Sequence, residues 1–242
     1  MANYILFVFE GEKREPQIFE SLKRYYFSAG TSSILIAAYC SNIYSLYQQL
    51  NNDPDLELFP LLKGNSKNSS LSGISREEIS ETYLFFDHDG HDGAASHCKL
   101  DTMLFLFDEE TSHGKLYISY PMVEALKHLN DATPFQDVVF QIAAGVRYKE
   151  AVANSGAPHY RNIPRLSRTR WKKIIAEHCK KLNFLMTDDF EFPTSLTSQQ
   201  DILARQKAKH IDTNNEVAVL SGFPIFIIDY YGCQKTAQMV SA

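Results

Sequence analysis

The sequence has 242 residues, of which 44% are hydrophobic and 22% are charged, a balance that excludes a disordered or fibrous chain. The formal net charge of −5 argues against a chain that is basic throughout, so any contact with nucleic acid needs a local basic segment. The apolar runs are shorter than the roughly 20 residues that cross a bilayer, and no basic segment precedes the N-terminal run. We therefore expect a cytoplasmic protein without a membrane partner.

The first 130 residues alternate between the patterns of strands and helices. Short apolar runs rich in β-forming residues predict strands at 4–9, 33–39, 83–86 and 115–119. Helical spacing of apolar residues follows each run, at 18–26, 43–50, 100–107 and 123–129. Residues 65–75 are crowded with Ser, Asn, Gly and Lys, which predicts an exposed and mobile loop. The alternation is typical of an α/β fold with a mostly parallel sheet flanked by helices.

The alternation fades after residue 130. Helical patterns dominate at 138–152, 167–185 and 198–210, and an apolar run follows at 217–231. We predict an α/β domain over residues 1–130 and a mainly helical region over residues 131–242 that packs on it. The cysteines are scattered and contain no CxxC pair, which favours free thiols over a zinc site or disulfides: Cys40, Cys98, Cys179 and Cys233.

Acidic side chains follow two of the predicted strands, at the point where each strand ends. Glu10 comes directly after the first strand, and Asp87 and Asp89 come after the strand that we place at the sheet centre. Because loops at the carboxyl ends of parallel strands converge, we expect the three carboxylates to meet there. Carboxylates held close together repel one another unless a cation neutralises them, and oxygen-only ligands suit Mg²⁺ or Mn²⁺. The sequence therefore predicts a metal site.

The local pattern around the two aspartates supports this interpretation. Residues at i and i+2 of an extended segment project to the same side, so Asp87 and Asp89 can reach one ion while His88 points away. Gly90 and Gly93 allow a tight turn and the close approach of a phosphate backbone. Asp92 is a candidate further ligand. For Asp92, as for Glu12, the alternative is an exposed acid beside a loop, which is the commoner case. The alternative for the whole motif is turn chemistry alone.

A basic segment lies in the second half of the chain, which the acidic total conceals. It contains candidate phosphate contacts, with Tyr160 and Trp171 available to stack on a base or sugar. A solvated helix face is the alternative, and most runs of charge are of that kind. The candidate nucleic-acid-binding residues are Lys149, Arg168, Arg170, Lys172 and Lys173; of these, Lys149, Lys172 or Lys173 could also stabilise transition-state charge.

Two of these motifs together resemble a known family. Phe9-Glu10-Gly11 after one strand and Asp87-x-Asp89 after a later one resemble the paired signature of the Toprim domain over roughly residues 4–130. Within that family the chain is similar to Toprim nucleases of bacterial anti-phage defence systems, such as the overcoming-lysogenization-defect and RloB-like groups. The resemblance implies a Toprim-like fold and a metal-dependent nuclease that hydrolyses DNA or RNA, with an ABC-type or SMC-like ATPase as its partner.

The resemblance also implies roles for particular residues. Glu10 would act in acid/base chemistry or hold a metal ion, and Asp87 and Asp89 would hold Mg²⁺ at the scissile phosphate. Defence-type relatives often carry another acid after the following strand, and Glu124 occupies a comparable place; an exposed glutamate at a helix start is its alternative. A site with two ions needs more than three carboxylates, so Glu124 or Asp92 would have to join it.

Two rival functions remain open at this stage. The apolar strand that ends in Asp87-His88-Asp89-Gly90 also resembles a haloacid-dehalogenase-like phosphatase, with Asp87 as nucleophile, Asp89 as general acid and 187–189 as the later acidic pair. That interpretation leaves Glu10 unexplained. The other rival is a Toprim-like regulatory module without catalysis. Self-association, and DNA versus RNA as the substrate, are not distinguished by the sequence.

Overall fold

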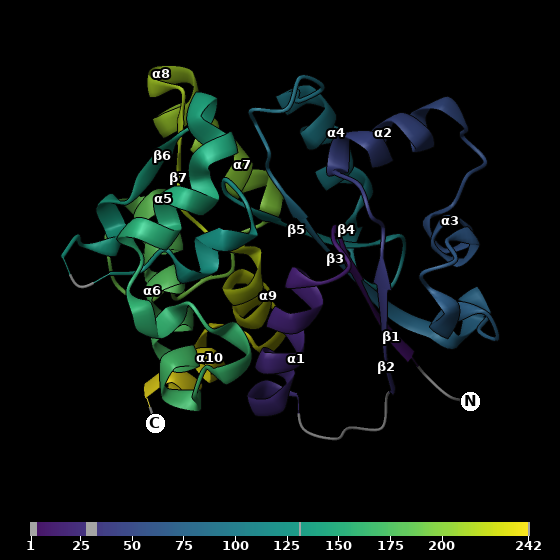
Figure 1. Ribbon diagram of the computed structural model, residues 1–242, viewed down its shortest axis with the longest axis horizontal. Helices are drawn as coiled ribbons and strands as arrows, with labels where there is room; N and C mark the ends of the chain where they lie inside the picture. The colour runs from purple at the N-terminus through teal and green to yellow at the C-terminus, as the bar shows by residue number, and fades with distance from the viewer. Residues whose placement is uncertain (1–3, 28–32, 131, 242) are drawn as a thin grey trace. The chain divides into compact units, whose positions relative to one another are not determined.

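The computed structural model describes residues 4–27, 33–130 and 132–241 (Figure 1). Their internal contacts group them into two compact units. The first, which we call the sheet unit, contains the residues up to 87 together with 94–117, and the second, the helical unit, contains 88–93 and 118 onward. These bounds differ from the division at residue 130 that the sequence predicts. Units defined by contacts do not test a domain boundary, so that boundary stays a prediction.

A five-stranded sheet has the strand order β2-β1-β3-β5-β4. The central strand pairs are parallel, because β1 (Tyr4–Phe9) runs in the same direction as both β2 (Ser33–Ala38) and β3 (Ile79–Asp87). At the other edge, β4 (Asp108–Glu109) is antiparallel to β5 (Gly114–Ser119). The predicted α/β fold with a mostly parallel sheet is thus confirmed. The strand predicted at 83–86 extends further at both ends, from Ile79 to Asp87.

Among its described residues, the sheet unit has four α-helices: α1 (Arg14–Tyr26), α2 (Ile43–Asn52), α3 (Leu58–Gly64) and α4 (His97–Leu106). The α1 helix packs on one face of the sheet, where the ring of Phe19 lies 4.0 Å from that of Phe7 and 5.7 Å from that of Phe9. Neighbouring residues of a strand face opposite sides, so Leu6 points to the other face, near Leu50 of α2. Both faces of β1 are therefore covered by helices, which explains its continuous apolar run.

Most residues of the segment 65–75 are exposed, as its composition predicts, but two buried residues anchor it. Asn68 is only 4% exposed, and a 3₁₀ turn follows it at Ser69–Leu71, with Leu71 buried. The Asn68 side chain accepts a hydrogen bond from the backbone N–H of Ala38 at 2.9 Å. It also donates to the carbonyls of Ala38 at 3.0 Å and Leu62 at 2.9 Å. The Asn68 amide therefore anchors the segment to backbone atoms at the end of β2. A polar composition does not reveal such an anchoring role.

The helical unit confirms the prediction of a mainly helical C-terminal region. Its longest helix, α6 (Arg168–Thr187), packs against α9 (Gly222–Tyr231) and α10 (Cys233–Ser241). The remaining elements are short: η3 (Val123–Lys127), η4 (Phe135–Asp137), β6 (Val139–Gln141), η5 (Ile142–Arg147), α5 (Tyr148–Ser155), η6 (Pro158–Tyr160), η7 (Ile163–Arg165), α7 (Gln199–Gln206), the π-helical η8 (Lys207–Ile211), α8 (Asp212–Asn214) and β7 (Glu216–Ala218).

Two local predictions for this unit were wrong, and a third was confirmed only in part. The helix expected at 138–152 begins instead as β6, which pairs antiparallel with β7, and becomes α-helical only at Tyr148. The helix expected at 123–129 is a 3₁₀ helix that ends at Lys127. Trp171, expected to stack on a base or sugar, is fully buried on the inner face of α6. For β6 the deciding partner is β7, which is distant in sequence, and local periodicity does not encode such a pairing.

Two findings bear on the expectations from composition. All four cysteines are free thiols, with Cys179 buried and Cys40 and Cys98 exposed. Throughout the parts of the chain that the structure describes, no helix combines the length and the apolar character that a bilayer crossing requires.

Candidate metal centre

Glu10 follows β1, and hydrogen bonds on both sides hold its backbone in place. Its N–H donates to the carbonyl of Phe85 at 3.1 Å, and its carbonyl accepts from the N–H of Cys40 at 2.8 Å. The ladders to β3 and β2 thus extend one residue beyond the strand. The Oε2 of Glu10 also accepts a hydrogen bond from the backbone N–H of Asp87 at 3.0 Å, so the end of β1 is tied directly to the end of β3.

The two aspartates are positioned differently from each other. Asp87 is the last residue of β3 and is 9% exposed. Asp89 lies beyond the strand with φ at +41°, a conformation that few residues other than glycine adopt. Its N–H donates to the carbonyl of Pro121 at 3.1 Å, and its carbonyl accepts from the N–H of Asp92 at 2.8 Å. A tight turn, rather than the extended alternation expected from the sequence, therefore sets the direction of Asp89.

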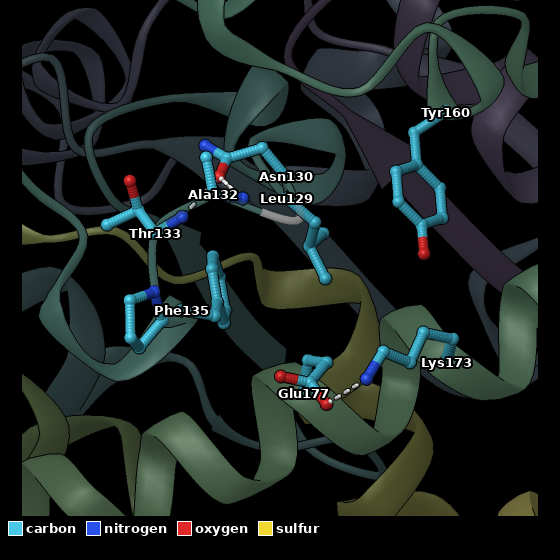
Figure 2. A pocket seen from close by; sticks show the side chains of 9 residues that line it. Leu129, Asn130, Ala132, Thr133, Phe135, Tyr160, Lys173 and Glu177 are labelled. Carbon is cyan, nitrogen blue, oxygen red and sulfur yellow. Dashed lines mark hydrogen bonds and ion pairs between the residues drawn. The ribbon is translucent and has the colours of Figure 1, made fainter.

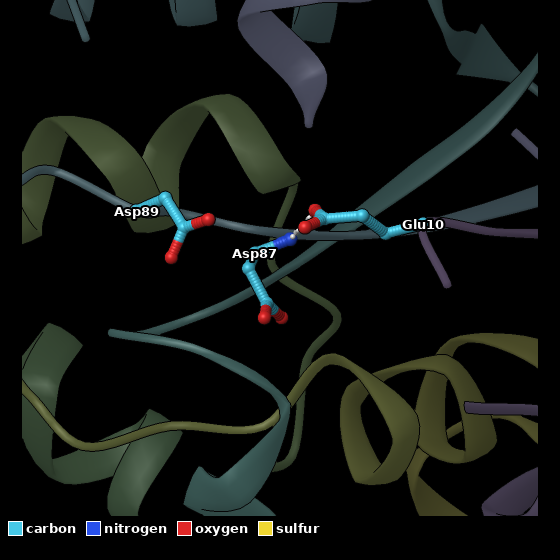
Figure 3. Close-up of side chains that lie close together, drawn as sticks. All are labelled: Glu10, Asp87 and Asp89. Carbon is cyan, nitrogen blue, oxygen red and sulfur yellow. Dashed lines mark hydrogen bonds between the residues drawn. The ribbon is translucent and has the colours of Figure 1, made fainter. Parts of the chain in front are cut away.

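The carboxylates of Glu10, Asp87 and Asp89 lie together, as the sequence predicts. One oxygen from each forms a set whose members are all within 4.8 Å of one another. Figure 3 shows Asp87 between the other two, with its backbone nitrogen bonded to Glu10. Glu10 and Asp87 belong to the sheet unit, and Asp89 is joined to Asp87 through a single intervening residue. Three oxygen donors at this spacing fit a hard divalent cation such as Mg²⁺ or Mn²⁺.

The electrostatic surroundings of Asp89 favour a cation. Burial raises the pKa of its carboxyl group above the ordinary value, and the nearby charges of Asp92 and Glu124 raise this pKa further. His91 and Lys149 act in the opposite direction and lower the pKa. Because desolvation is the largest of these effects, the ionised form of Asp89 is disfavoured in the protein alone. A bound cation would reverse that balance.

The residues around Asp89 have clear structural tasks. His88 is fully buried, with its ring 5.2 Å from that of Tyr120, so it occupies the protein interior. A Cβ atom at Gly90 would lie 2.5 Å from Cε1 of His88, which explains the need for glycine there. Gly93, by contrast, has open space around the position of a Cβ atom. Of these two glycines, only Gly90 is thus required by the local packing.

Two further acids were considered from the sequence as ligands. Glu124, on η3, is only 4% exposed, so the alternative of an exposed helix-start glutamate does not apply. Its charge acts on Asp89. Among the residues that the structure describes, however, the set of acidic oxygens within 4.8 Å contains only Glu10, Asp87 and Asp89. The roles of Glu124 and Asp92 as metal ligands therefore remain predictions. The exposed Glu12 forms an ion pair with Lys67.

Sequence reasoning left one neighbour of the site without a role. The charge of His91 acts on Asp89, and its ring lies directly against Gly145 of η5, where a Cβ atom would be 2.5 Å from the ring Nδ1. The histidine in the run Asp87-His88-Asp89-Gly90-His91 was a visible signal. The matching glycine lies 54 positions further along the sequence (145 − 91), so the pairing could not be foreseen.

The predicted nucleic-acid contacts lie on two helices of the helical unit. Lys149 is exposed on α5. The other four belong to the first turns of α6, where Lys172 is half-buried and the remaining three are exposed: Arg168, Arg170, Lys172 and Lys173. Lys173 also forms an ion pair with Glu177 at 2.7 Å. The basic residues are thus accessible, which contact with phosphates would require.

The phosphatase interpretation loses its second motif. It requires an acidic pair after a strand, but residues 182–186 are helical and Asp188 is the left-handed C-cap of α6, with φ at +65°. Asp188 instead forms an ion pair with Lys209 at 2.6 Å. The hydrogen bond from Asp87 to Glu10 gives Glu10 a position that the phosphatase interpretation does not explain.

Comparison of the sequence with protein family models, with curated proteins and with solved structures gave no match. Any function is therefore argued from the site itself and from the resemblance of its motifs.

Proposed function

We propose that this protein is a metal-dependent nuclease that hydrolyses phosphodiester bonds of DNA or RNA. The observation that supports the proposal is the convergence of three carboxylates at the ends of β1 and β3, held in place by the hydrogen bond from the Asp87 N–H to Glu10. Carboxylates at this spacing repel one another, and a bound cation would offset that repulsion. A divalent cation is the partner that their chemistry suits best.

In this proposal Glu10, Asp87 and Asp89 hold Mg²⁺ or Mn²⁺. When bound, such an ion supplies charge stabilisation to a reacting phosphate and orients water. The Asp87 N–H restricts the orientation of the Glu10 carboxylate, which in this proposal binds the ion or accepts a proton from the attacking water. Lys149, whose charge already acts on Asp89, is placed to stabilise negative charge that develops on the phosphate.

The resemblance to defence-system Toprim nucleases adds two further parts to the proposal. It suggests that the nuclease is the effector of a bacterial anti-phage system and that an ABC-type or SMC-like ATPase controls it. A nuclease without such control would damage the nucleic acid of its own cell, so an inactive resting state is expected. Assays should therefore include Mn²⁺ and single-stranded substrates, which require the least activation.

A cleavage panel tests the proposed function. Single- and double-stranded DNA and RNA are incubated with the full chain and either Mg²⁺, Mn²⁺ or EDTA. We expect cleavage only with a metal ion, and a loss of more than about 100-fold in Asp87→Asn and in Asp89→Asn, since even residues behind the metal ligands typically contribute 10- to 100-fold. Asp108→Asn is the matched control, because Asp108 is an exposed aspartate on β4. Cleavage that persists unchanged in both site variants would exclude the proposal.

A further inference from the structure

A second candidate site lies within the helical unit. It is a pocket of about 380 Å³, a size within the usual range of small-ligand sites. Figure 2 shows its main features: Lys173 and Glu177 are paired on α6, and Leu129, Phe135 and Tyr160 form apolar walls. A pocket that combines apolar walls with a few convergent polar groups is the arrangement expected of a ligand site. The nuclease proposal gives this pocket no role.

Hydrogen bonds fix the rim and walls of the pocket. At the rim, the Asn130 side chain accepts from the N–H groups of Ala132 at 2.9 Å and Thr133 at 2.7 Å. The wall segments are tied together because the N–H of Ala157 donates to the carbonyl of Leu129 at 2.8 Å, and the N–H of Tyr160 donates to the carbonyl of Ala157 at 3.0 Å. The pocket is therefore formed in advance, which reduces the entropy lost on binding.

Phe135 is held from behind by a buried lysine. The Nζ of Lys181, which is 1% exposed, donates to the carbonyl of Phe135 at 2.9 Å and also to that of Val138. The same ammonium lies 5.0 Å from the centroid of the Phe135 ring. This wall is thus fixed by both its backbone and its ring.

The two charged residues of the pocket differ in exposure. The side chain of Glu177 is 17% exposed and that of Lys173 is 60% exposed. The lysine can swing toward solvent or toward a ligand, whereas the carboxylate stays recessed in the pocket. A ligand that replaces the lysine at Glu177 must therefore present hydrogen-bond donors, such as N–H groups, to a carboxylate.

A third residue extends this arrangement along the helix. Arg170, Lys173 and Glu177 are spaced by three and four residues, so they lie on one face of α6. Both basic residues are exposed. The rise from Arg170 to Glu177 is roughly 10 Å, comparable with the span from the phosphate of a nucleotide to the far edge of its base. An anionic group at Arg170 and Lys173 would thus place an attached ring near Glu177.

We propose that this pocket binds a guanine nucleotide. Among the bases, guanine carries two adjacent N–H donors on one edge, N1–H and N2–H₂, and these match a carboxylate in bidentate fashion. Adenine and cytosine place an acceptor beside their amino group, and uracil and thymine carry a single N–H between two acceptors, so the carboxylate disfavours them. The apolar walls receive the planar base, and Arg170 and Lys173 contact its phosphate. The guanine is either that of a free nucleotide or an unpaired residue of a strand.

Binding measurements with defined nucleotides test the proposal. Calorimetry is performed on the full chain in EDTA with GMP, IMP, AMP, CMP and UMP. Inosine lacks the N2 amino group, so we expect GMP to bind at least about tenfold more tightly than IMP, and AMP, CMP and UMP to bind more weakly still. Equal affinity for GMP and AMP, or no binding of GMP and of guanine oligonucleotides, would overturn the proposal.

Two variants locate the binding. Glu177→Gln keeps the size of the side chain and should weaken GMP binding by tenfold or more, whereas Glu150→Gln, an exposed glutamate of α5, should not. Lys173→Gln should weaken the binding of GMP but not that of guanosine, which lacks a phosphate. Circular dichroism verifies that each variant is folded. Unchanged GMP affinity in Glu177→Gln contradicts the proposed contact.

Two further ligands identify the source of the guanine. A short single strand with one guanine in a thymine context binds more tightly than GMP if the pocket serves a strand, and more weakly if it serves a free nucleotide. Both results support the guanine site. The proposal goes beyond the nuclease function and does not depend on it, because binding in EDTA needs neither the three carboxylates nor cleavage.

Discussion

The two units place their polar side chains in opposite ways. In the sheet unit, the strand interiors are largely apolar, and the acids Glu10 and Asp87 stand where the strands end. In the helical unit, polar and basic groups lie inside, with His178 and Gln206 fully buried and Lys181 almost so. The comparison teaches that the acids at the strand ends of the sheet unit mark a candidate site, whereas a buried polar residue of the helical unit can equally be a structural clamp.

Gln206 illustrates the clamp. Its side chain donates to the carbonyl of Ala218 at 2.8 Å and accepts from the N–H of the same residue at 2.9 Å. It therefore satisfies both backbone groups of a residue on β7. A buried polar group with partners of this kind stabilises one arrangement of the chain, because the alternatives leave it without hydrogen bonds.

Asn68 is a structural clamp of the sheet unit and provides the largest expected effect on stability. Asn68→Ala removes three hydrogen bonds from a buried position, so we expect the free energy of unfolding to fall by about 3 kcal/mol. Asn51→Ala, at an exposed position near the end of α2, should change it by less than about 0.5 kcal/mol. Urea unfolding measures both. Equal effects in the two variants would show that Asn68 contributes no more than a surface residue.

Lys181 provides the next effect, and it depends on pH. Burial lowers the pKa of Lys181 from its ordinary value of 10.5 to about 7, while Asp137 raises it slightly. Between these two pH values the unfolded chain keeps the proton and the folded chain releases it, so stability increases with pH across this window. Lys181→Met removes that dependence and takes one of two donors from each of the carbonyls of Phe135 and Val138, which keep the backbone N–H groups of Val138 and Val219.

We therefore expect Lys181→Met to destabilise the protein by about 2 kcal/mol at pH 9 and by less at pH 6.5. Urea unfolding at several pH values measures the difference. Lys180→Met is the matched control, because Lys180 is the adjacent and partly exposed residue of the same helix. A destabilisation that does not widen as the pH rises from 6.5 to 9 would contradict this account of Lys181.

The comparison also explains how much the sequence could predict. Alternating apolar runs predicted β1, β2, β3 and β5, since strands covered on both faces need continuous apolar residues. The acids at their ends predicted the cluster of Glu10, Asp87 and Asp89, because parallel strands bring their carboxyl ends to one edge.

What escaped prediction depends on contacts between distant residues. Nothing in the order of residues shows that the backbone of Asp89 turns left-handed, that Asn68 binds the end of β2, or that Glu177 lines a pocket with Leu129. The segment that became β6 has a helical pattern but pairs with β7, about 77 residues away along the chain (216 − 139), so tertiary contacts override its local preference.

The measurement that tests the central claim most directly is the binding of Mn²⁺ to the wild-type protein and to Glu10→Gln by calorimetry. The glutamine side chain of this variant can still accept the hydrogen bond from the Asp87 N–H, so the substitution removes the charge and leaves the local structure. We predict that Mn²⁺ binds the wild type and Asp108→Asn alike and binds Glu10→Gln at least about tenfold more weakly. Equal binding by all three proteins, or no binding by the wild type, would contradict a metal centre built from Glu10, Asp87 and Asp89.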